Sequence, residues 1–300
     1  MRNRALTALT LLFSLLCGGA ALCQGSPGGT SMDNAAVERG RYLTTAGGCL
    51  SCHTDAENDG QAFAGGHRLE TPYGIFHVPN ITPDANTGIG AWSDAEFLAA
   101  MRNGTSPDGD YYYPAFPYPS YAGLTERDIL DIKAFLDSLK PVEQSTKPHE
   151  LHWYVPGRWA MSLWQSWFAP WDYGEIPPEA DRVWQRGAYL VRHLGHCGEC
   201  HTPRNALGEL QLDQELAGYP KQDEQSGAPD ITPNKKTGIG QWAQEDIEFF
   251  LELGMLPDGD FVGSTMAAVI DDNTSLLTPA DRTAIAVYLQ SLAIPSDKEQ

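Results

Sequence analysis

Two motifs of the form C-x-x-C-H contain the residues best suited to chemistry. They are Cys49, Cys52 and His53 in CLSCH, and Cys197, Cys200 and His201 in CGECH. Two thiols three positions apart can bond the two vinyl groups on one edge of a porphyrin, and the adjacent histidine then reaches the iron. A zinc site would need four clustered ligands, and a thioredoxin-like motif has no need of the histidine. The motifs therefore predict two covalently bound haems of the c type.

The first 23 residues are typical of a secretory signal peptide. Two arginines within the first four residues precede an apolar run over residues 5–16, and small residues follow. The run is shorter than the roughly 20 apolar residues that a membrane span needs. We expect cleavage after Cys23, since acylation of Cys17 or Cys23 is disfavoured by the leucine before each. The sequence therefore predicts an exported, periplasmic protein.

The chain is strongly acidic. Removal of the signal segment leaves 18 basic against 39 acidic residues, a net charge of −21 in place of −19. A surface of this sign repels nucleic acid and anionic lipid. We therefore expect no nucleic-acid partner, whereas basic protein surfaces are compatible with the charge. A solvated acidic surface that keeps the protein soluble explains most of this negative charge.

The two motifs lie in two similar halves of the chain. The segments Asn80-Ile-Thr-Pro, Thr87-Gly-Ile-Gly and Trp92 recur 150 residues later as Asp230-Ile-Thr-Pro, Thr237-Gly-Ile-Gly and Trp242. Repetition of this kind indicates duplicated structural units. We predict two tandem cytochrome c-like domains over about 33–140 and 181–293, joined by an aromatic-rich connector over 141–180.

Each half is predicted to be mainly α-helical. We expect a helix before each motif, over 35–45 and 181–194. Ser93, followed three residues later by a glutamate, predicts the start of a second helix in the first half. Thr125 and Thr278 are expected to begin the last helix of each half, which has one apolar face. The Gly- and Pro-rich stretch between motif and second helix is expected to form a loop around a flat cofactor.

A methionine of the second half is a candidate sixth ligand. Met266, in Gly263-Ser-Thr-Met, follows His201 by 65 residues and lies in a predicted loop before the last helix. A thioether sulfur binds haem iron, and His/Met ligation raises the potential and blocks the iron to exogenous ligands. The alternative is a methionine that fills a gap in the core. The spacing and the predicted loop favour the ligand.

The corresponding position of the first half is Phe116, 150 residues earlier. Phenylalanine cannot bind iron, so three interpretations stay open. The iron is five-coordinate beneath Phe116, or the loop is shifted, or another residue coordinates. The candidates for that last case are His67, His77, Met101, Tyr111, Tyr112 and Tyr113. The residues alone do not decide among the three.

The connector is not a flexible linker. It holds five tryptophans, with tyrosine, phenylalanine and several prolines, whereas flexible linkers are rich in glycine and serine. We expect it to pack between the domains and to fix one haem relative to the other. The alternative is an exposed aromatic patch for a partner or for peripheral membrane association.

Segments along both halves resemble the multihaem cytochrome c subunits of membrane-associated bacterial alcohol, gluconate and sugar dehydrogenases. They include Thr71-Pro-Tyr-Gly, Thr87-Gly-Ile-Gly-Ala-Trp, Tyr113-Pro-Ala-Phe-Pro-Tyr-Pro-Ser-Tyr and Leu194-Gly-His-Cys-Gly-Glu-Cys-His-Thr-Pro-Arg-Asn. The resemblance implies class I-like cytochrome c domains and electron transfer. Those subunits often have three haem domains and a membrane anchor, whereas two motifs are present here, so the likeness does not assign a specific dehydrogenase.

An electron carrier is the function that these features favour. Such a periplasmic dihaem cytochrome would accept electrons from a dehydrogenase and pass them to an oxidase or another cytochrome. The rival is a haem enzyme, a peroxidase or a sulfur-compound oxidoreductase, acting at the first haem. Phe116 favours that rival, but no acid/base group is visible beyond scattered histidines and Arg68. A sensor would need an output domain, and none is apparent. We assign no catalytic residue.

Overall fold

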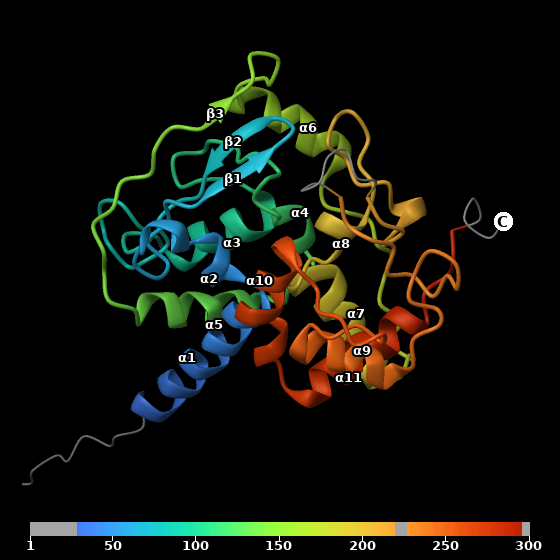
Figure 1. The fold of residues 1–300 in the computed structure, drawn as a ribbon. Coiled ribbons are helices and arrows are strands. Elements are labelled where there is room, and N and C mark those ends of the chain that lie inside the picture. The colour runs from blue at the N-terminus through green and yellow to red at the C-terminus, as the bar shows by residue number, and fades with distance from the viewer. Residues whose placement is uncertain (1–28, 220–226, 296–300) are drawn as a thin grey trace, which may run out of the picture.

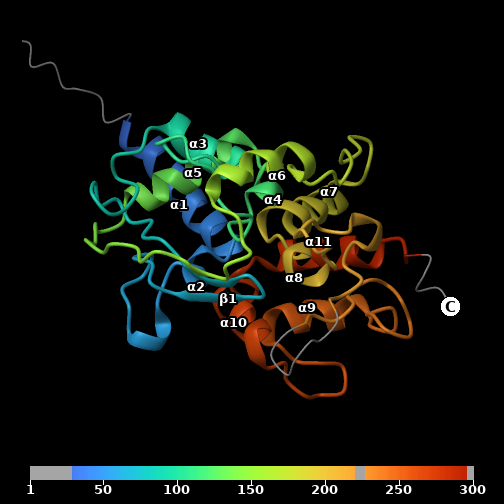
Figure 2. The ribbon, with the colours of Figure 1, turned by 90° about the horizontal axis from the view of Figure 1, so that it is seen from above.

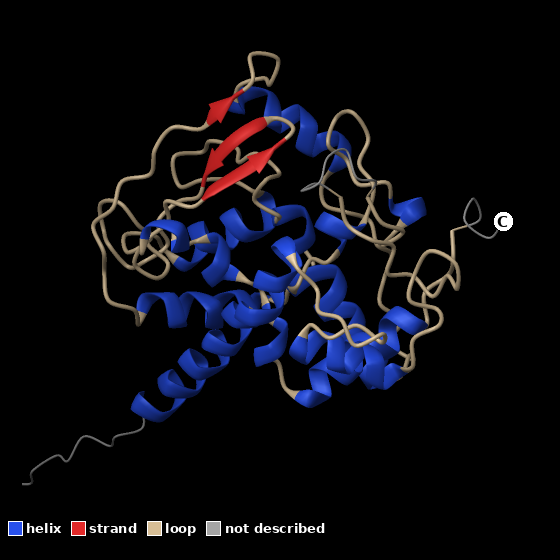
Figure 3. Cartoon of the chain, viewed as in Figure 1, coloured by secondary structure: helices blue, strands red, loops and turns tan. Residues whose placement is uncertain are grey.

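The structure is a computed structural model that describes residues 29–219 and 227–295. The predicted signal segment over 1–23 lies outside these residues. The described chain is mainly helical, as expected, with one small sheet (Figure 3). Within it, no helix is long and apolar enough to cross a membrane.

Most helices of the first repeat lie on one side of the molecule and most helices of the second repeat on the other (Figures 1 and 2). The helices of the first repeat are α1 (Gly29–Ala46), α2 (Cys49–Cys52), η1 (Ala56–Asn58), α3 (Asp94–Asn103), α4 (Tyr118–Tyr121) and α5 (Glu126–Asp137). Those of the connector are η2 (Arg158–Ala160) and α6 (Met161–Phe168). Those of the second repeat are α7 (Arg182–Tyr189), the π-helical turn η3 (Leu190–Leu194), α8 (Gly198–His201), η4 (Leu212–Gln214), α9 (Gln244–Leu253), α10 (Ser264–Asp272), η5 (Thr274–Leu276) and α11 (Pro279–Gln290). Helix α10 of the second repeat contacts α2 of the first.

In each repeat the first and last helices cross at a glycine. A Cβ atom at Gly40 of α1 would overlap the carbonyl of Asp131 on α5. A Cβ atom at Gly187 of α7 would overlap the carbonyl of Ala284 on α11. The missing side chain lets the two helix backbones touch, so each C-x-x-C-H motif begins directly beyond a tight helix pair.

The helix starts predicted from the sequence are confirmed. Ser93 caps α3, and its backbone N–H donates to the Glu96 carboxylate at 2.7 Å in a reciprocal capping box. Thr125 and Thr278 accept hydrogen bonds from the third residue of α5 and α11, respectively. The helix before the first motif begins earlier than expected, at Gly29 in place of residue 35.

A hairpin lies in the stretch that was expected to be a loop. Strands β1 (Arg68–Thr71) and β2 (Gly74–His77) pair antiparallel, and β3 (Glu150–Leu151) from the connector pairs with β2. The turn is closed by the Thr71 hydroxyl, which donates to the Gly74 carbonyl at 2.8 Å. Gly74 has a φ of 116°, which favours glycine. The wrapping segment is therefore partly ordered as a sheet, and the connector begins by extending it.

One hydrophobic cluster contains residues of both repeats, from Leu43 on α1 to Leu289 on α11. A second, smaller cluster is built around the connector. There Trp164 and Trp171, 9% and 6% exposed, pack with Tyr118 of the first repeat and Leu210 of the second. These tryptophans therefore join parts of the chain that lie far apart in sequence.

Candidate functional site

The first C-x-x-C-H motif forms a single helical turn, α2. Gly48, in the left-handed conformation, precedes it and lets the chain turn from α1 into this helix. The Cys49 and Cys52 thiols are both free. Burial raises the pKa of Cys49 to about 12 and also raises the pKa of Cys52. Cys52 as a residue is nevertheless exposed at the surface, so a group can approach the motif from that side.

His53 is held so that one ring nitrogen can bind a metal. Its Nδ1 lies 2.8 Å from the carbonyl oxygen of Pro79. A carbonyl only accepts, so Nδ1 carries the proton and Nε2 keeps its lone pair. Burial lowers the pKa of His53 to about 4, and nearby His67 adds to this. A neutral imidazole oriented through its second nitrogen is the usual state of a metal-binding histidine.

The second motif repeats this arrangement. Cys197 precedes α8, whose last two residues are Cys200 and His201. The Nδ1 atom of His201 lies 2.8 Å from the carbonyl oxygen of Pro229, the residue that corresponds to Pro79 at the offset of 150. Burial lowers the pKa of His201 and raises the pKa of Cys197 to about 12. Two equivalent sites are therefore built by the same local geometry.

The donor set fits a haem better than a bare metal ion. Over residues 29–219 and 227–295, no group of three or more His, Cys, Asp or Glu side chains is placed to hold a metal ion. One histidine beside two thiols on one helical turn is what a haem requires, because the porphyrin supplies four nitrogens to the iron and the thiols bond its edge. The residues present thus fit a covalently attached haem at each motif.

Met266 lies in a helix, so the predicted loop position was wrong. Ser-Thr-Met-Ala-Ala-Val-Ile contains good helix formers after Gly263, and α10 begins at Ser264. Met266 is half-buried in the first turn of this helix. Its candidacy as a ligand stays a prediction that depends on how far its flexible side chain reaches.

Phe116 lies at the start of the segment that leads into α4. Its ring makes edge contacts with Tyr112 at 5.7 Å and with Tyr121 at 5.8 Å between centroids. Two of the alternative ligands have other packing: Met101 is 7% exposed within the large hydrophobic cluster, and the ring of buried His77 lies 2.8 Å from the Glu150 carboxylate. The structure therefore surrounds the Met266-equivalent position with aromatic rings.

The two motifs lie close together. The Tyr121 ring of α4 packs against the ring of His196, which directly precedes Cys197, with 5.5 Å between centroids. On the other side, the Asn273 amide after α10 donates to the carbonyl of Ala46, just before the first motif, at 3.2 Å. In each repeat, the segment before the last helix thus contacts the residues that precede the other repeat's motif.

Glu199, between the two cysteines of the second motif, is a further residue that contributes to this site. Its carboxylate accepts hydrogen bonds from Ser120 Oγ at 2.6 Å, from Trp171 Nε1 at 2.9 Å and from the Arg204 guanidinium. These donors come from α4, the connector and the second repeat. A lone glutamate at a variable motif position carries no signal in the sequence, because its partners are distant.

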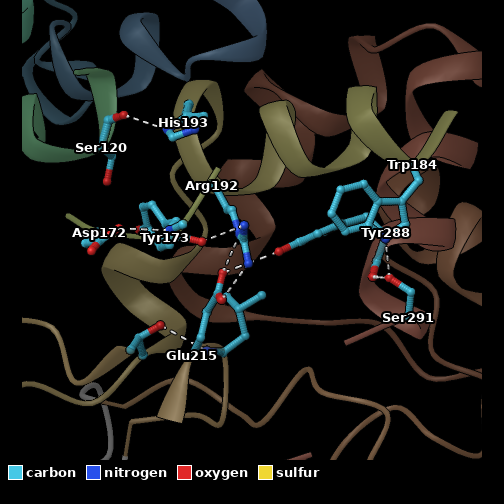
Figure 4. Close-up of polar contacts among 12 residues, drawn as sticks. Ser120, Asp172, Tyr173, Trp184, Arg192, His193, Glu215, Tyr288 and Ser291 are labelled. Carbon is cyan, nitrogen blue, oxygen red and sulfur yellow. Dashed lines mark hydrogen bonds and ion pairs between the residues drawn. The ribbon is translucent and has the colours of Figure 1, made fainter. Parts of the chain in front are cut away.

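A polar network holds η3 just before the second motif (Figure 4). The Arg192 guanidinium donates to both carboxylate oxygens of Glu215, at 3.0 and 3.1 Å, and to the Tyr173 carbonyl at 2.9 Å. His193 Nδ1 donates to the Ser120 carbonyl at 3.0 Å. The bidentate pair and the contact with α4 fix the direction in which the chain enters the motif.

The chain is similar in sequence to known proteins that contain cytochrome c domains. Residues 37–140 match the family model for cytochrome c. A diheme cytochrome c-type protein of Cereibacter sphaeroides is 43% identical over 263 residues, which cover 85% of each chain. The cytochrome c subunit of gluconate 2-dehydrogenase from Pantoea cypripedii is 39% identical over 269 residues, covering 87% of this chain and 60% of that subunit.

A cytochrome c subunit of alcohol dehydrogenase (quinone), from Gluconacetobacter polyoxogenes, is 40% identical over 291 residues. The match covers 93% of this chain and 60% of the subunit. The chain therefore spans about 60% of the length of these two dehydrogenase subunits, and most of the length of the Cereibacter protein.

Proposed function

Because this chain belongs to the cytochrome c family, we propose that it is an exported, periplasmic electron carrier with two covalently bound haems, one on each C-x-x-C-H motif. The observation that supports this best is the repeated histidine geometry. His53 and His201 each bond a proline carbonyl through Nδ1 at 2.8 Å and keep Nε2 for iron.

In this proposal the protein attaches the two haems, orients them relative to each other and shields them from water. We assign Cys49 and Cys52 to the first haem and Cys197 and Cys200 to the second, with one histidine each as the proximal ligand. A bound haem supplies an iron that gains or loses one electron. We assign Met266 to the sixth position of the second iron. Cys52 of the first motif is near enough to Cys200 of the second to interact with it electrostatically, which favours transfer between the two haems.

The similar proteins suggest which kind of protein donates the electrons. Two of them are the cytochrome c subunits of gluconate 2-dehydrogenase and of alcohol dehydrogenase (quinone). We therefore propose that a periplasmic dehydrogenase reduces this protein and that an oxidase or another cytochrome oxidises it. Two tandem domains, over about 33–140 and 181–293, each carry one haem in this proposal.

The test is the haem content of the exported protein. Expression with its own signal segment and a haem-attachment system should give two haems per chain by alkaline pyridine absorbance. Replacing Cys49 and Cys52 with alanine should leave one, as should replacing Cys197 and Cys200. Ser51→Ala, a change inside the first motif that removes no thiol, should retain both. One haem in the parent protein, or two in either cysteine variant, would contradict the proposal.

A second candidate function rests on Phe116. If no side chain covers the first iron, that haem could take a small ligand and act as an enzyme, such as a peroxidase. The aromatic surroundings of Phe116 favour this over a shifted loop. Electron paramagnetic resonance and carbon monoxide titration decide between the candidates: two low-spin haems that bind no carbon monoxide leave only the carrier.

A further inference from the structure

The connector presents an apolar ridge to the outside of the molecule. Trp159, Leu163 and Trp167 are 81%, 52% and 64% exposed. They follow one another at intervals of four residues through η2 and α6, so they lie on one face of this helical segment. The segment runs along the outer edge of the molecule (Figure 1). We call these three residues the Trp ridge.

The opposite face of the same helix is buried against the rest of the protein. Met161 and Trp164 are 6% and 9% exposed and pack in the smaller hydrophobic cluster with Trp171. The helix therefore has an apolar face on each side, of which one is covered. Large apolar side chains that are not used for folding and lie together on a surface mark an interaction site.

Carboxylates lie near the Trp159 end of the ridge, around the neighbouring Arg158. A recess of about 370 Å³ beside it is lined by Arg158, Glu96, Asp108 and Asp110. Arg158 is paired with Asp110 at 4.0 Å, and both aspartates are exposed. The net charge at this end is therefore negative.

The Trp167 end of the ridge is also acidic. A recess of about 450 Å³ there is lined by Trp167 itself and by the carboxylates of Asp172, Glu209 and Asp213. Asp172 and Asp213 are exposed. The Trp ridge is thus an apolar centre with acidic groups at both ends.

The ridge is connected to the second motif by aromatic contacts. Trp167 packs on Phe168 with 6.1 Å between ring centroids, Phe168 on Trp164 at 5.5 Å, and Trp164 on Trp171 at 5.6 Å. Trp171 donates to Glu199, between the two cysteines of the motif, at 2.9 Å. A protein seated on the ridge would therefore be connected to the second motif through a continuous series of packed aromatic rings.

We infer that the Trp ridge is the docking surface for a redox protein whose own contact patch is apolar at the centre and lysine- or arginine-rich at the rim. This deepens the proposed function, on which it rests. Aromatic anchors in the middle supply most of the affinity of such interfaces, and the acidic ends set orientation and association rate. The clusters of carboxylates at the two ends of the Trp ridge favour a partner with a basic rim.

A membrane surface fits the ridge less well. Tryptophan is common at the membrane interface, but the helix itself carries no lysine or arginine after Arg158, and that arginine is paired with Asp110. The acidic ends, and the net charge of −19 for the whole chain, repel anionic headgroups. Charge complementarity therefore favours a basic protein.

The test uses the haem-loaded full chain and, as a probe, a small basic cytochrome c whose exposed haem edge is ringed by lysines. Calorimetric titration at low ionic strength should show binding. Trp159→Ser with Trp167→Ser should weaken it by about tenfold or more. Asp108→Asn with Asp213→Asn should weaken it by about threefold or more and flatten its salt dependence.

The matched control is Phe249→Ser with Phe261→Ser, two aromatic residues of the second repeat that are 50% and 63% exposed; it should bind like the parent. No binding by the parent protein, or equal binding by the ridge variant, would overturn the proposal. So would binding to vesicles of phosphatidylcholine or phosphatidylglycerol that the ridge variant loses. Haem content measured on the same samples tests the proposed function separately, since a haem-free preparation contradicts that function whatever binds.

Discussion

The Tyr42 hydroxyl on α1 donates a hydrogen bond to the Asp281 carboxylate on α11 at 2.6 Å. An equivalent hydrogen bond runs from the second repeat to the first. Tyr189 on α7 donates to Asp128 on α5, also at 2.6 Å. Each repeat therefore offers a tyrosine from its first helix to an aspartate of the other repeat's last helix. The two repeats are related by an approximate twofold relationship, with these bonds on either side of their contact.

Removing either hydroxyl should destabilise the contact between the repeats. Tyr42→Phe and Tyr189→Phe each delete a hydrogen bond to a carboxylate, which is worth about 1.5–3 kcal/mol. We expect each variant to lower the free energy of unfolding by about 1–2 kcal/mol, since water replaces part of the bond. Urea unfolding of the haem-loaded protein measures this.

Tyr73→Phe is the matched control, because Tyr73 is half-buried and its hydroxyl makes no hydrogen bond within the described residues; it should unfold like the parent. If Tyr42→Phe and Tyr189→Phe are as stable as this control, the two bonds do not hold the repeats together. Unequal losses would indicate that the approximate symmetry does not extend to the energetics.

Asp281 should make stability depend on pH in the acid range. Burial raises its pKa, but the hydrogen bonds from Arg186 (2.9 and 2.7 Å) and Tyr42 outweigh this and hold the pKa below its usual value of 3.8. The folded state therefore favours the carboxylate. Its contribution is complete above about pH 4 and is lost as the pH falls through the lower, folded pKa.

Asp281→Asn removes that contribution at every pH. Near neutral pH the variant should be less stable than the parent by about 2 kcal/mol. The gap should narrow below about pH 4, because the parent then loses the same interaction. Unfolding measured at a series of pH values gives the difference directly. A gap that stays constant down to about pH 2 would show that Asp281 does not titrate as described.

The close helix crossings depend on glycine. In Gly187→Ala, helix propensity gains about 1 kcal/mol, but the new methyl group overlaps the Ala284 carbonyl of α11. Overpacking typically costs about 1–3 kcal/mol, and the upper end applies here because the methyl group meets backbone atoms of α11 and not a flexible side chain, so the variant should be destabilised on balance. Thermal unfolding checks this, with Val183→Ala on the exposed part of α7 as control. A more stable Gly187→Ala would mean that the two helices separate freely.

Local signals in the sequence predicted the parts of this fold that are local. Ser93, Thr125 and Thr278 identify helix starts because a cap needs only three or four consecutive residues. The C-x-x-C-H motifs were found for the same reason. The hairpin after the first motif was missed, because its strands are short and one is completed by β3 of the connector.

Contacts between distant segments could not be predicted in this way. Tyr42 and Asp281 are 239 residues apart, and nothing near either residue indicates its partner. The same holds for Glu199, whose donors include Ser120 and Trp171. The position of Met266 before the last helix predicts a loop, whereas the structure has an additional helix there, α10. Tertiary packing decided these cases.

Glu199 should influence both stability and the second haem. Glu199→Gln keeps the shape but removes the charge that the Arg204 guanidinium and Trp171 face. We expect a loss of about 2–3 kcal/mol in unfolding free energy. We also expect a higher reduction potential for the second haem, because a nearby negative charge stabilises the oxidised iron. Spectroelectrochemical titration measures the potential.

Glu209→Gln is the control for this change, since Glu209 bonds Asn205 at 2.6 Å and does not contact the motif. It should shift neither quantity appreciably. A Glu199→Gln protein whose stability falls while both potentials stay unchanged would give Glu199 a purely structural role. A lowered potential would contradict the charge argument itself.

Met266 should determine the ligand state of one haem. Met266→Ala removes the only thioether in the first turn of α10, so the weak long-wavelength band of sulfur-to-iron ligation should disappear from the oxidised spectrum. The potential of the second haem should fall, because His/Met ligation raises it. Carbon monoxide should then bind the second iron. Met255→Ala, outside α10, should keep the band. If the band survives in Met266→Ala, another residue holds the sixth position, and the correspondence between Met266 and Phe116 then no longer predicts a difference between the two haems.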